Sequence, residues 1–383
     1  MSRFIALCCT LLALGSASFV LGQGGETGAI QGIVADRNGA IVPDVNIVVK
    51  NLATSFERVV VSKSNGAYNV PGLPPGNYSV TAELRGFAKF AANVLVNVGR
   101  TTDANVKLEP AGTAEVIEVN AIAPLVETAK TDVGGVVDNR DVTNLPLNGR
   151  NFSSLATLLP GARPVSAWDP TKTRMGAVSL AGAGGRNFNT TIDGIDNKDN
   201  TVGGYVQNIS LEGVREFALK TRFSAADGRT GGGLLSIVTK SGSQDFHGSL
   251  FSFFRDKRLN MNDYFSAHAN KPKTDFSRQQ FGASIGGPIK KERAFFFFTH
   301  ERLLEDASLP VEPSITNEMQ LLKSNGIVLY GVTPVPASVI PTPYKSALTT
   351  LKIDFLINRG TPRICRGTRA GTGWRMTGPA SLI

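Results

Sequence analysis

Residues 28–108 are dominated by short runs in which apolar and polar side chains alternate. In residues 45–49 every odd position is apolar, and in residues 78–82 every even position is, so each run would place one apolar face on a strand. The stretch Pro74-Pro75-Gly76-Asn77 is a strong turn signal between such runs. Strands and turns at this spacing predict a small antiparallel β-sandwich over residues 25–110.

Residues 132–245 combine one predicted helix with predicted strands. Asn151 can cap a helix, and Pro160-Gly161 would end it. Apolar residues at helical spacing lie between them: Phe152, Leu155, Leu158 and Leu159. Residues 214–220 and 234–239 are apolar runs that predict strands. The residues that favour tight turns or close backbone packing are Asp193, Gly194, Asp196, Asn197, Gly231, Gly232 and Gly233.

Residues 246–312 predict further strands, of which residues 281–286 are the most regular. Phe281, Ala283 and Ile285 alternate there with glycine and serine. Apolar side chains outward and small ones inward are typical of a strand in a transmembrane barrel. The run Phe295 to Phe298 would form either an aromatic girdle at the membrane interface or a buried core strand. Residues 260–273 would be an external loop.

The first 22 residues predict a signal peptide. Arg3 provides a short positive start, an apolar run follows, and small residues precede Gln23. The alternative is an uncleaved membrane anchor, because the apolar run is near the minimum of about 17 residues for a span. After cleavage only Cys365 would remain of the three cysteines, so no intramolecular disulfide is expected.

Composition adds to this picture mainly by exclusion. Glycine provides 41 of the 383 residues and charged residues only 19%, which suits β structure with many turns. The net charge of +9 could indicate nucleic acid, but no motif of a nucleic-acid-binding fold is present. A metallopeptidase is disfavoured as well, because Leu304 stands where a second zinc-binding histidine would follow His300-Glu301. We therefore expect no catalytic residue, no metal site, no cofactor and no enzymatic activity.

The order of three segments, IDGIDN, EGVREF and TRFSAADGRTGGGLLSIVTKSGS, resembles the plug domain of TonB-dependent outer-membrane receptors. It is most similar to the Oar-like branch, which carries a carboxypeptidase-regulatory-like domain in front. Residues 25–110 resemble that domain, whose fold is shared with starch-binding modules. The resemblance implies an α+β plug over residues 132–245 and the first strands of a transmembrane β-barrel over residues 246–312. The expected fold class is therefore mainly β.

The resemblance also implies a function and partners. The plug would gate the passage of an unknown ligand through the barrel, using energy from the inner-membrane TonB complex. The other partner would be outer-membrane lipid, with plug and sandwich on the periplasmic side. The chain by itself could remain in the periplasm. The alternatives are a secreted or periplasmic carbohydrate-binding sandwich and an outer-membrane assembly or adhesion protein.

Two sets of candidate residues go with these functions. Within the linker at residues 111–131, an alternating segment is a candidate energy-coupling strand, a role that the family assigns to such a strand: Glu115, Val116, Ile117, Glu118 and Val119. The alternative is an ordinary connecting strand. Tyr68, Tyr78 and Phe87 are candidate glycan contacts, although aromatic residues in such a domain more often fill the core.

Residues 313–383 predict an irregular tail. Prolines are frequent near its start, and the last 25 residues are rich in arginine and contain no acidic residue. We expect a truncated or frameshifted reading frame here, with a basic tail of real function as the alternative. Transporters of this type use about 22 strands, so the strands predicted here are too few to close a barrel.

Overall fold

The computed structural model describes residues 27–377 except 112–115, 122–133, 138, 146, 148–149, 166–176, 181, 183–186, 200–203, 221–230, 263, 269–272, 329–334, 357–365 and 371–372. The predicted signal peptide and Glu115 therefore lie outside the described residues. The chain forms two compact units. The first holds residues up to Gly248 together with Ile285–Thr299 and the chain from Thr349 onward, and the second holds Ser249–Ser284 and His300–Leu348.

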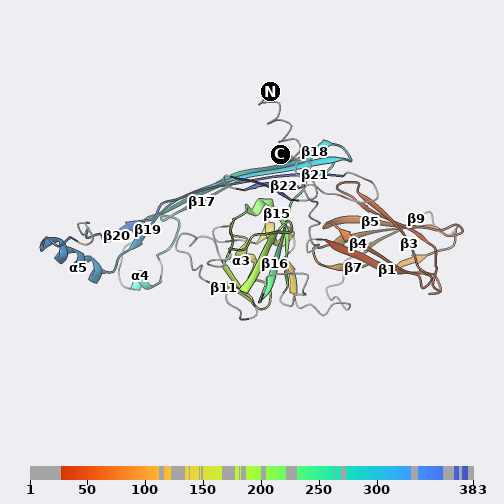
Figure 1. Ribbon diagram of the computed structural model, residues 1–383, viewed down its shortest axis with the longest axis horizontal. Helices are drawn as coiled ribbons and strands as arrows, with labels where there is room; N and C mark the ends of the chain where they lie inside the picture. Colours follow the sequence, from red (N-terminus) through yellow and green to blue (C-terminus); the bar gives the residue numbers. More distant parts are fainter. Residues whose placement is uncertain are drawn as a thin grey trace, which may run out of the picture. The chain divides into compact units, whose positions relative to one another are not determined.

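Residues 28–121 form two sheets, drawn from red to orange in Figure 1. One sheet has the order β4-β1-β7 with β8 also on β1, and the other has the order β3-β2-β5-β6-β9. The strands are β1 (Gly28–Asp36), β2 (Asn46–Asn51), β3 (Glu57–Val61), β4 (Ala67–Leu73), β5 (Gly76–Glu83), β6 (Lys89–Val96), β7 (Thr101–Asp103), β8 (Val106–Leu108) and β9 (Val116–Ala121).

The core of these sheets comes from the alternation seen in the sequence. The apolar positions of residues 45–49 and 78–82 are buried with side chains of the other sheet, such as Ile30 and Val34. Within the first sheet, Gly32 of β1 lies against the connection between β7 and β8, where a Cβ atom would be 2.1 Å from the carbonyl oxygen of Ala104. Only glycine leaves room for this contact.

A second core lies among residues 134–239. Its sheet has the order β10-β15-β16-β13-β14. The strands are β10 (Gly134–Val137), β13 (Phe188–Ile192), β14 (Ile195–Asp196), β15 (Val214–Lys220) and β16 (Gly233–Thr239). The other elements are α2 (Asn139–Asn144), α3 (Ser153–Ala156), η4 (Leu211–Gly213) and the pair β11 (Ala162–Val165) and β12 (Ala177–Leu180).

The predicted helix after Asn151 is shorter than its apolar pattern indicates. Helix α3 covers only Ser153–Ala156, and the Oδ1 atom of Asn151 accepts a hydrogen bond from the backbone N–H of Ser153 at 3.0 Å. Phe152 and Leu155 are buried in the core as expected, but Leu158 is 56% exposed. The helix ends before Leu158, so this side chain does not follow the helical face.

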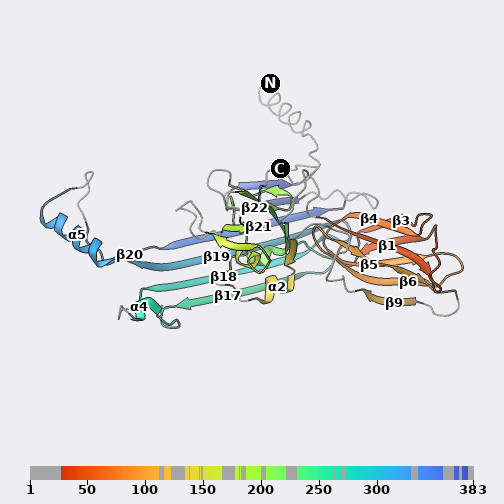
Figure 2. The ribbon, with the colours of Figure 1, turned by 90° about the horizontal axis from the view of Figure 1, so that it is seen from below.

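The remaining long strands form an open sheet with the order β17-β18-β19-β20, and β21 also pairs with β19 (Figure 2). Within the described residues this order does not return to β17. The elements are β17 (His247–Asp256), α4 (Tyr264–His268), β18 (Phe276–Lys290), β19 (Ala294–Pro310), α5 (Pro313–Ser324), β20 (Val339–Pro341) and β21 (Tyr344–Phe355). A separate pair is formed by β22 (Arg366–Ala370) and β23 (Gly373–Thr377).

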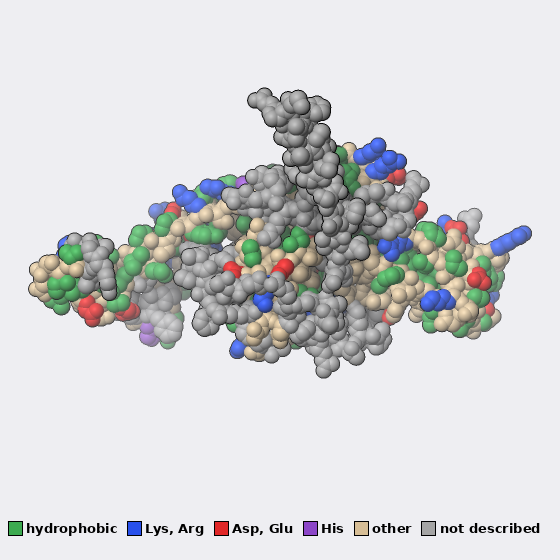
Figure 3. Space-filling model, in the orientation of Figure 1, with side chains coloured by type: hydrophobic (Ala, Val, Ile, Leu, Met, Phe, Trp, Pro, Cys, Tyr) green, Lys and Arg blue, Asp and Glu red, His purple; other side chains and the backbone are tan. Residues whose placement is uncertain are grey.

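Strand β18 alternates as the sequence predicts. Phe281 and Ile285 are 43% and 46% exposed, whereas Ser284 and Gly286 are buried. The phenylalanine run in β19 divides in the same way, because Phe295 and Phe297 are buried while Phe296 and Phe298 are half-buried. Figure 3 shows hydrophobic side chains, in green, on the surface of the molecule. None of the helices in the described part of the chain has the length and apolar character needed to cross a membrane.

The prediction of an irregular tail over residues 313–383 is wrong for the described part of that range. It contains helix α5 and the long strand β21. Thr350, Lys352 and Asp354 are buried and alternate with Leu351, Ile353 and Phe355 along β21. Strands of soluble proteins are recognised in a sequence by their apolar buried face. Because the buried face of β21 is polar, the sequence did not indicate this strand.

Tyr78 makes the stability of the sandwich sensitive to high pH. Its hydroxyl donates a hydrogen bond to the carbonyl oxygen of Pro74 at 2.7 Å. Burial raises the pKa of Tyr78 from 10.0 to about 12, against the opposing effect of nearby Asn51 and two arginines. The folded state therefore keeps this proton when the unfolded chain has lost it. The stabilisation is fully present below pH 10 and is lost as the pH rises through 12.

We predict that Tyr78→Phe lowers the free energy of unfolding by about 1 kcal/mol at neutral pH, because the hydrogen bond is lost. Between pH 10 and 12 its stability should decline less than that of the wild type, a difference that urea denaturation at each pH would measure. The exposed Tyr264 offers the control Tyr264→Phe. Parallel declines for the wild type and Tyr78→Phe would contradict this account.

Candidate functional site

A two-residue turn joins β13 to β14. Ile192 pairs with Ile195, so Asp193 and Gly194 occupy the two central positions. Both have left-handed backbones, with φ of 49° and 82°. A tight hairpin turn of this kind needs positive φ at both positions, which aspartate tolerates and glycine adopts without strain.

The turn also directs the carboxylate of Asp193 into the interior. Its Oδ1 atom accepts a hydrogen bond from the backbone N–H of Thr239 at 3.1 Å, and its Oδ2 atom accepts one from the hydroxyl of Thr239. The ammonium group of Lys352, on β21, lies 3.6 Å from Oδ1 of Asp193. It donates a hydrogen bond to the carbonyl oxygen of Thr239 at 3.0 Å. Asp193 and Lys352 therefore form a buried ion pair that shares one threonine.

Both charged side chains of the buried ion pair are only 1% exposed. Removing such groups from water costs several kcal/mol for each ion, which the attraction and the hydrogen bonds to Thr239 must offset. Each of the two charges is therefore stable in the interior only while the other is present. The pair joins the hairpin between β13 and β14 to strand β21, which is far along the chain.

The other turn residues of this region are also bound internally. Asp196 accepts a hydrogen bond from the backbone N–H of Lys198 at 3.0 Å. The buried side chain of Asn197 makes two hydrogen bonds to the backbone of Gln207, donating to its carbonyl oxygen at 2.9 Å and accepting from its N–H at 3.0 Å. Asn197 thereby fixes the segment that leads to η4.

Of the three consecutive glycines, Gly231 is exposed and Gly232 and Gly233 are buried. The backbone N–H of Gly231 donates a hydrogen bond to the carbonyl oxygen of Asn187 at 2.8 Å. Gly233 has a φ of 141° and begins the pairing of β16 with β13. The bend thus places β16, and with it Thr239, beside the hairpin that carries Asp193.

A second charged cluster lies in the same region. The guanidinium of Arg150 contacts Oε1 of Glu212 at 2.8 Å, and the ammonium group of Lys240 lies 3.9 Å from Oε2 of Glu212. Burial lowers the pKa of Lys240, while the negative charge of Glu212 acts in the opposite direction. This cluster ties the chain before α3 to η4 and to the end of β16.

The sandwich residues considered for glycan binding have different positions. Tyr68 and Tyr78 are buried in the core, and the hydroxyl of Tyr68 donates a hydrogen bond to the carbonyl oxygen of Ala104. Neither ring has a free face on which a sugar could stack. Phe87 is partly buried and packs against the same core.

The candidate coupling segment is a strand over Val116–Ala121, which is β9. It pairs in parallel with β6, from Lys89 opposite Val116 to Val94 opposite Ala121. Strand β9 is the last strand in the order of its sheet.

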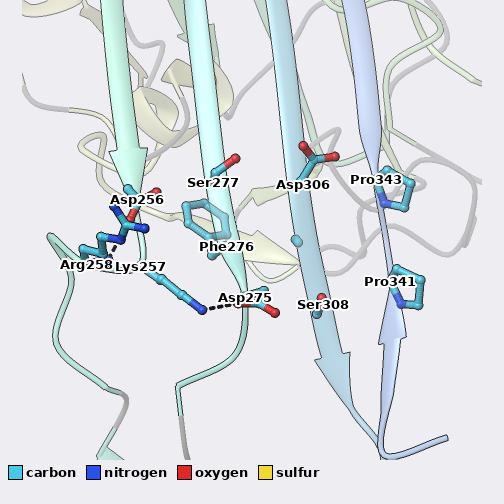
Figure 4. Close-up of a pocket in the computed structure, with 11 residues that line it drawn as sticks. Asp256, Lys257, Arg258, Asp275, Phe276, Ser277, Asp306, Ser308, Pro341 and Pro343 are labelled. Carbon is cyan, nitrogen blue, oxygen red and sulfur yellow. Dashed lines mark hydrogen bonds and ion pairs between the residues drawn. The ribbon is translucent and has the colours of Figure 1, made fainter.

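A cavity of about 370 Å³ lies at the ends of β17, β18, β19 and β20 (Figure 4). Ion-paired Lys257 and Asp275 line it together with Phe276 and Asp306. Farther along the same strands, Arg278 binds Glu305 and Gln280 binds Glu301. Sequence reasoning found none of these pairs, because each links residues on different strands. No group of three or more metal-ligating side chains occurs among the described residues.

Comparison with known proteins agrees with this architecture. Residues 29–109 match the family model of the carboxypeptidase regulatory-like domain, and residues 238–326 match that of an outer membrane beta barrel domain. The TonB-dependent transporter Oar of Myxococcus xanthus is 29% identical over 302 residues. This chain is related to the TonB-dependent outer-membrane receptors. The predicted resemblance to these receptors, the mainly β fold class and the outer-membrane location are thereby confirmed.

The match covers 75% of this chain but only 27% of Oar. Two solved structures are also similar in part. The outer membrane transporter YddB from Escherichia coli aligns over 62% of this chain and 33% of its own, with a TM-score of 0.43 and 13% identity. The siderophore receptor PirA from Acinetobacter baumannii aligns over 62% of this chain and 32% of its own, with a TM-score of 0.39 and 15% identity.

The glycine bend generates a first prediction for this region. Gly232→Val should destabilise the sheet of residues 134–239, because Gly232 is buried where β16 begins. Limited proteolysis of the purified chain would show faster cleavage within these residues. The matched control is Gly231→Ala, since a Cβ atom there meets nothing closer than 3.8 Å. Equal protease resistance of Gly232→Val and the wild type would contradict the packing role.

The buried ion pair generates a second prediction. Lys352→Met should lower the free energy of unfolding by about 3–5 kcal/mol, because it leaves the Asp193 carboxylate buried without a counter-charge. The double variant Asp193→Asn with Lys352→Met should recover most of that loss. Proteolysis of the purified chain across a urea series would measure both. Lys345→Met, at an exposed position of the same strand, is the control. If Lys352→Met unfolded at the same urea concentration as the control, the pair would not hold the hairpin to β21.

Proposed function

We propose that this chain acts as the plug, with its preceding sandwich and the first wall strands, of a TonB-dependent receptor that moves a ligand across the outer membrane. The buried ion pair carries the proposal. It connects the plug hairpin at Asp193 to Lys352 on β21, where the buried polar residues Thr350, Lys352 and Asp354 alternate with the less buried apolar residues Leu351, Ile353 and Phe355. The relationship to TonB-dependent receptors supports it.

A charged contact suits a plug that must be held and later displaced. While the site is dry, the pair is strong because the effective dielectric constant is low. Once water enters, each charge regains its hydration, and the cost of separating the two falls. Apolar surface would regain no comparable hydration on separation. The pair would therefore hold the plug at rest and yield when the plug is pulled.

The energy for displacement would enter through the candidate coupling strand, residues 115–119. Strand β9 includes Val116, Ile117, Glu118 and Val119, and it lies at the end of its sheet. A terminal strand has one edge on which a further strand can be added. The partner would be the inner-membrane TonB complex. We propose no enzymatic activity, in keeping with the transporter relative.

This proposal predicts that the purified chain binds the periplasmic domain of TonB through β9. Successive residues of a strand direct their N–H groups to opposite edges, so either Ile117→Pro or Glu118→Pro removes a donor from the edge that the partner uses. At least one of the two variants should weaken binding tenfold or more in a titration. Ala129→Pro, in the same linker but outside β9, should bind like the wild type.

Two results would contradict the coupling role. One is a wild-type chain that does not bind the TonB domain. The other is wild-type affinity in both proline variants, because pairing with the backbone of β9 cannot tolerate both substitutions.

A further inference from the structure

The plug strand β15 contains an irregularity at Arg215. Val214 pairs with Thr239 and Glu216 pairs with Val238, so Arg215 is an extra residue opposite β16. A β-bulge of this kind redirects the side chains next to it. Here the redirected side chains are those of Arg215 and Glu216, and both contact the sandwich.

Glu216 makes the more direct contact. Its side chain is buried, and its Oε1 atom accepts a hydrogen bond from the backbone N–H of Val98 at 2.7 Å. Val98 follows strand β6 of the sandwich and is buried as well. A hydrogen bond to a buried carboxylate is among the stronger ones in proteins, so its loss from this buried position would be costly.

Arg215 lies against strand β5 of the sandwich. A Cβ atom on Gly76 would be only 3.1 Å from its Nη2 atom, so the absence of a side chain there leaves space for the guanidinium. Burial lowers the pKa of Arg215, and the nearby Glu216 and Tyr78 act in the opposite direction.

Apolar and neutral polar contacts extend the same interface. Val98 packs with Ala218 of β15, Val238 of β16 and the partly buried Val136. The residues after β16 reach the sandwich too, since the backbone N–H of Gln244 donates to the carbonyl oxygen of Ala53 at 3.0 Å. The interface thus combines a desolvated charge, a backbone donor and an apolar cluster.

We infer that the Arg215–Glu216 bulge is a docking element that fixes the sandwich to the plug, so that the two domains move as one body. Plug displacement would then carry the sandwich along or break this interface. The consequence for transport rests on the proposed function, whereas the docking itself does not.

The docking also supplies a route for force. Strand β9 pairs with β6, Val98 follows β6, and the Val98 N–H is bound by Glu216 of β15. A pull on β9 would therefore reach the central strands of the plug through the sandwich as well as through the linker. In this mechanism the sandwich transmits force from β9 to the plug.

The test follows the backbone amide of Val98 by hydrogen exchange in the purified chain. Glu216→Ala should accelerate its exchange at least tenfold, and Glu216→Gln, which keeps an acceptor, should accelerate it less. Lys89→Ala is the control, because it removes a surface ion pair with Glu83 on the same domain. Unchanged exchange of Val98 in Glu216→Ala would overturn the inference.

A second measurement remains informative if Glu216→Ala fails to fold. A protease site inserted between residues 122 and 130 would be cut, and the fragments passed over a gel-filtration column. The inference predicts that sandwich and plug elute together, and that Arg215→Ala shifts them toward separate elution. Separation of the wild-type fragments would overturn it. Neither readout depends on TonB binding, so a failed docking and a failed coupling role give different results.

Discussion

The structure depends on the burial of the Asp193 carboxylate beside the Lys352 ammonium group. Two charges that are almost fully removed from water are tolerated only because each is satisfied, and Thr239 satisfies both. This requirement determines much around it. The hairpin must adopt left-handed backbone at Asp193, the glycine bend must bring β16 alongside, and β21 must supply a lysine on its buried face.

The same principle recurs at several other buried charges in the described part of the chain. Arg150 and Lys240 share Glu212, Arg278 binds Glu305, and Glu216 binds the backbone of Val98. Polar groups that are paired inside a protein can be exchanged for water at moderate cost when the contact opens. An architecture that is assembled through paired polar groups is stable at rest, and it remains separable in a way that a purely apolar interface is not.

The sandwich and the plug differ in the interactions that stabilise them. The sandwich buries an alternating apolar face on each sheet, so its stability comes mainly from apolar area. The plug region has its own apolar core and adds charged contacts at its margins. The bulge at Arg215 lies where the two meet. Because of this local distortion, the side chains of Arg215 and Glu216 depart from the regular alternation of β15 and contact the sandwich.

Local features of this protein were determined by the sequence by itself. Strand alternation at residues 45–49, 78–82 and 281–286 and the Asp-Gly turn depend on nearest neighbours and backbone preference, so they are readable from a few residues. The tertiary structure alone decided which distant groups meet. In the sequence, Lys352 is a polar residue in a proline-rich tail. Only the structure shows that β21 places it against Asp193. The burial of Tyr78, the exposure of Leu158 and the contact of Glu216 with Val98 likewise depend on the packing of separate elements, and no spacing along the chain encodes them.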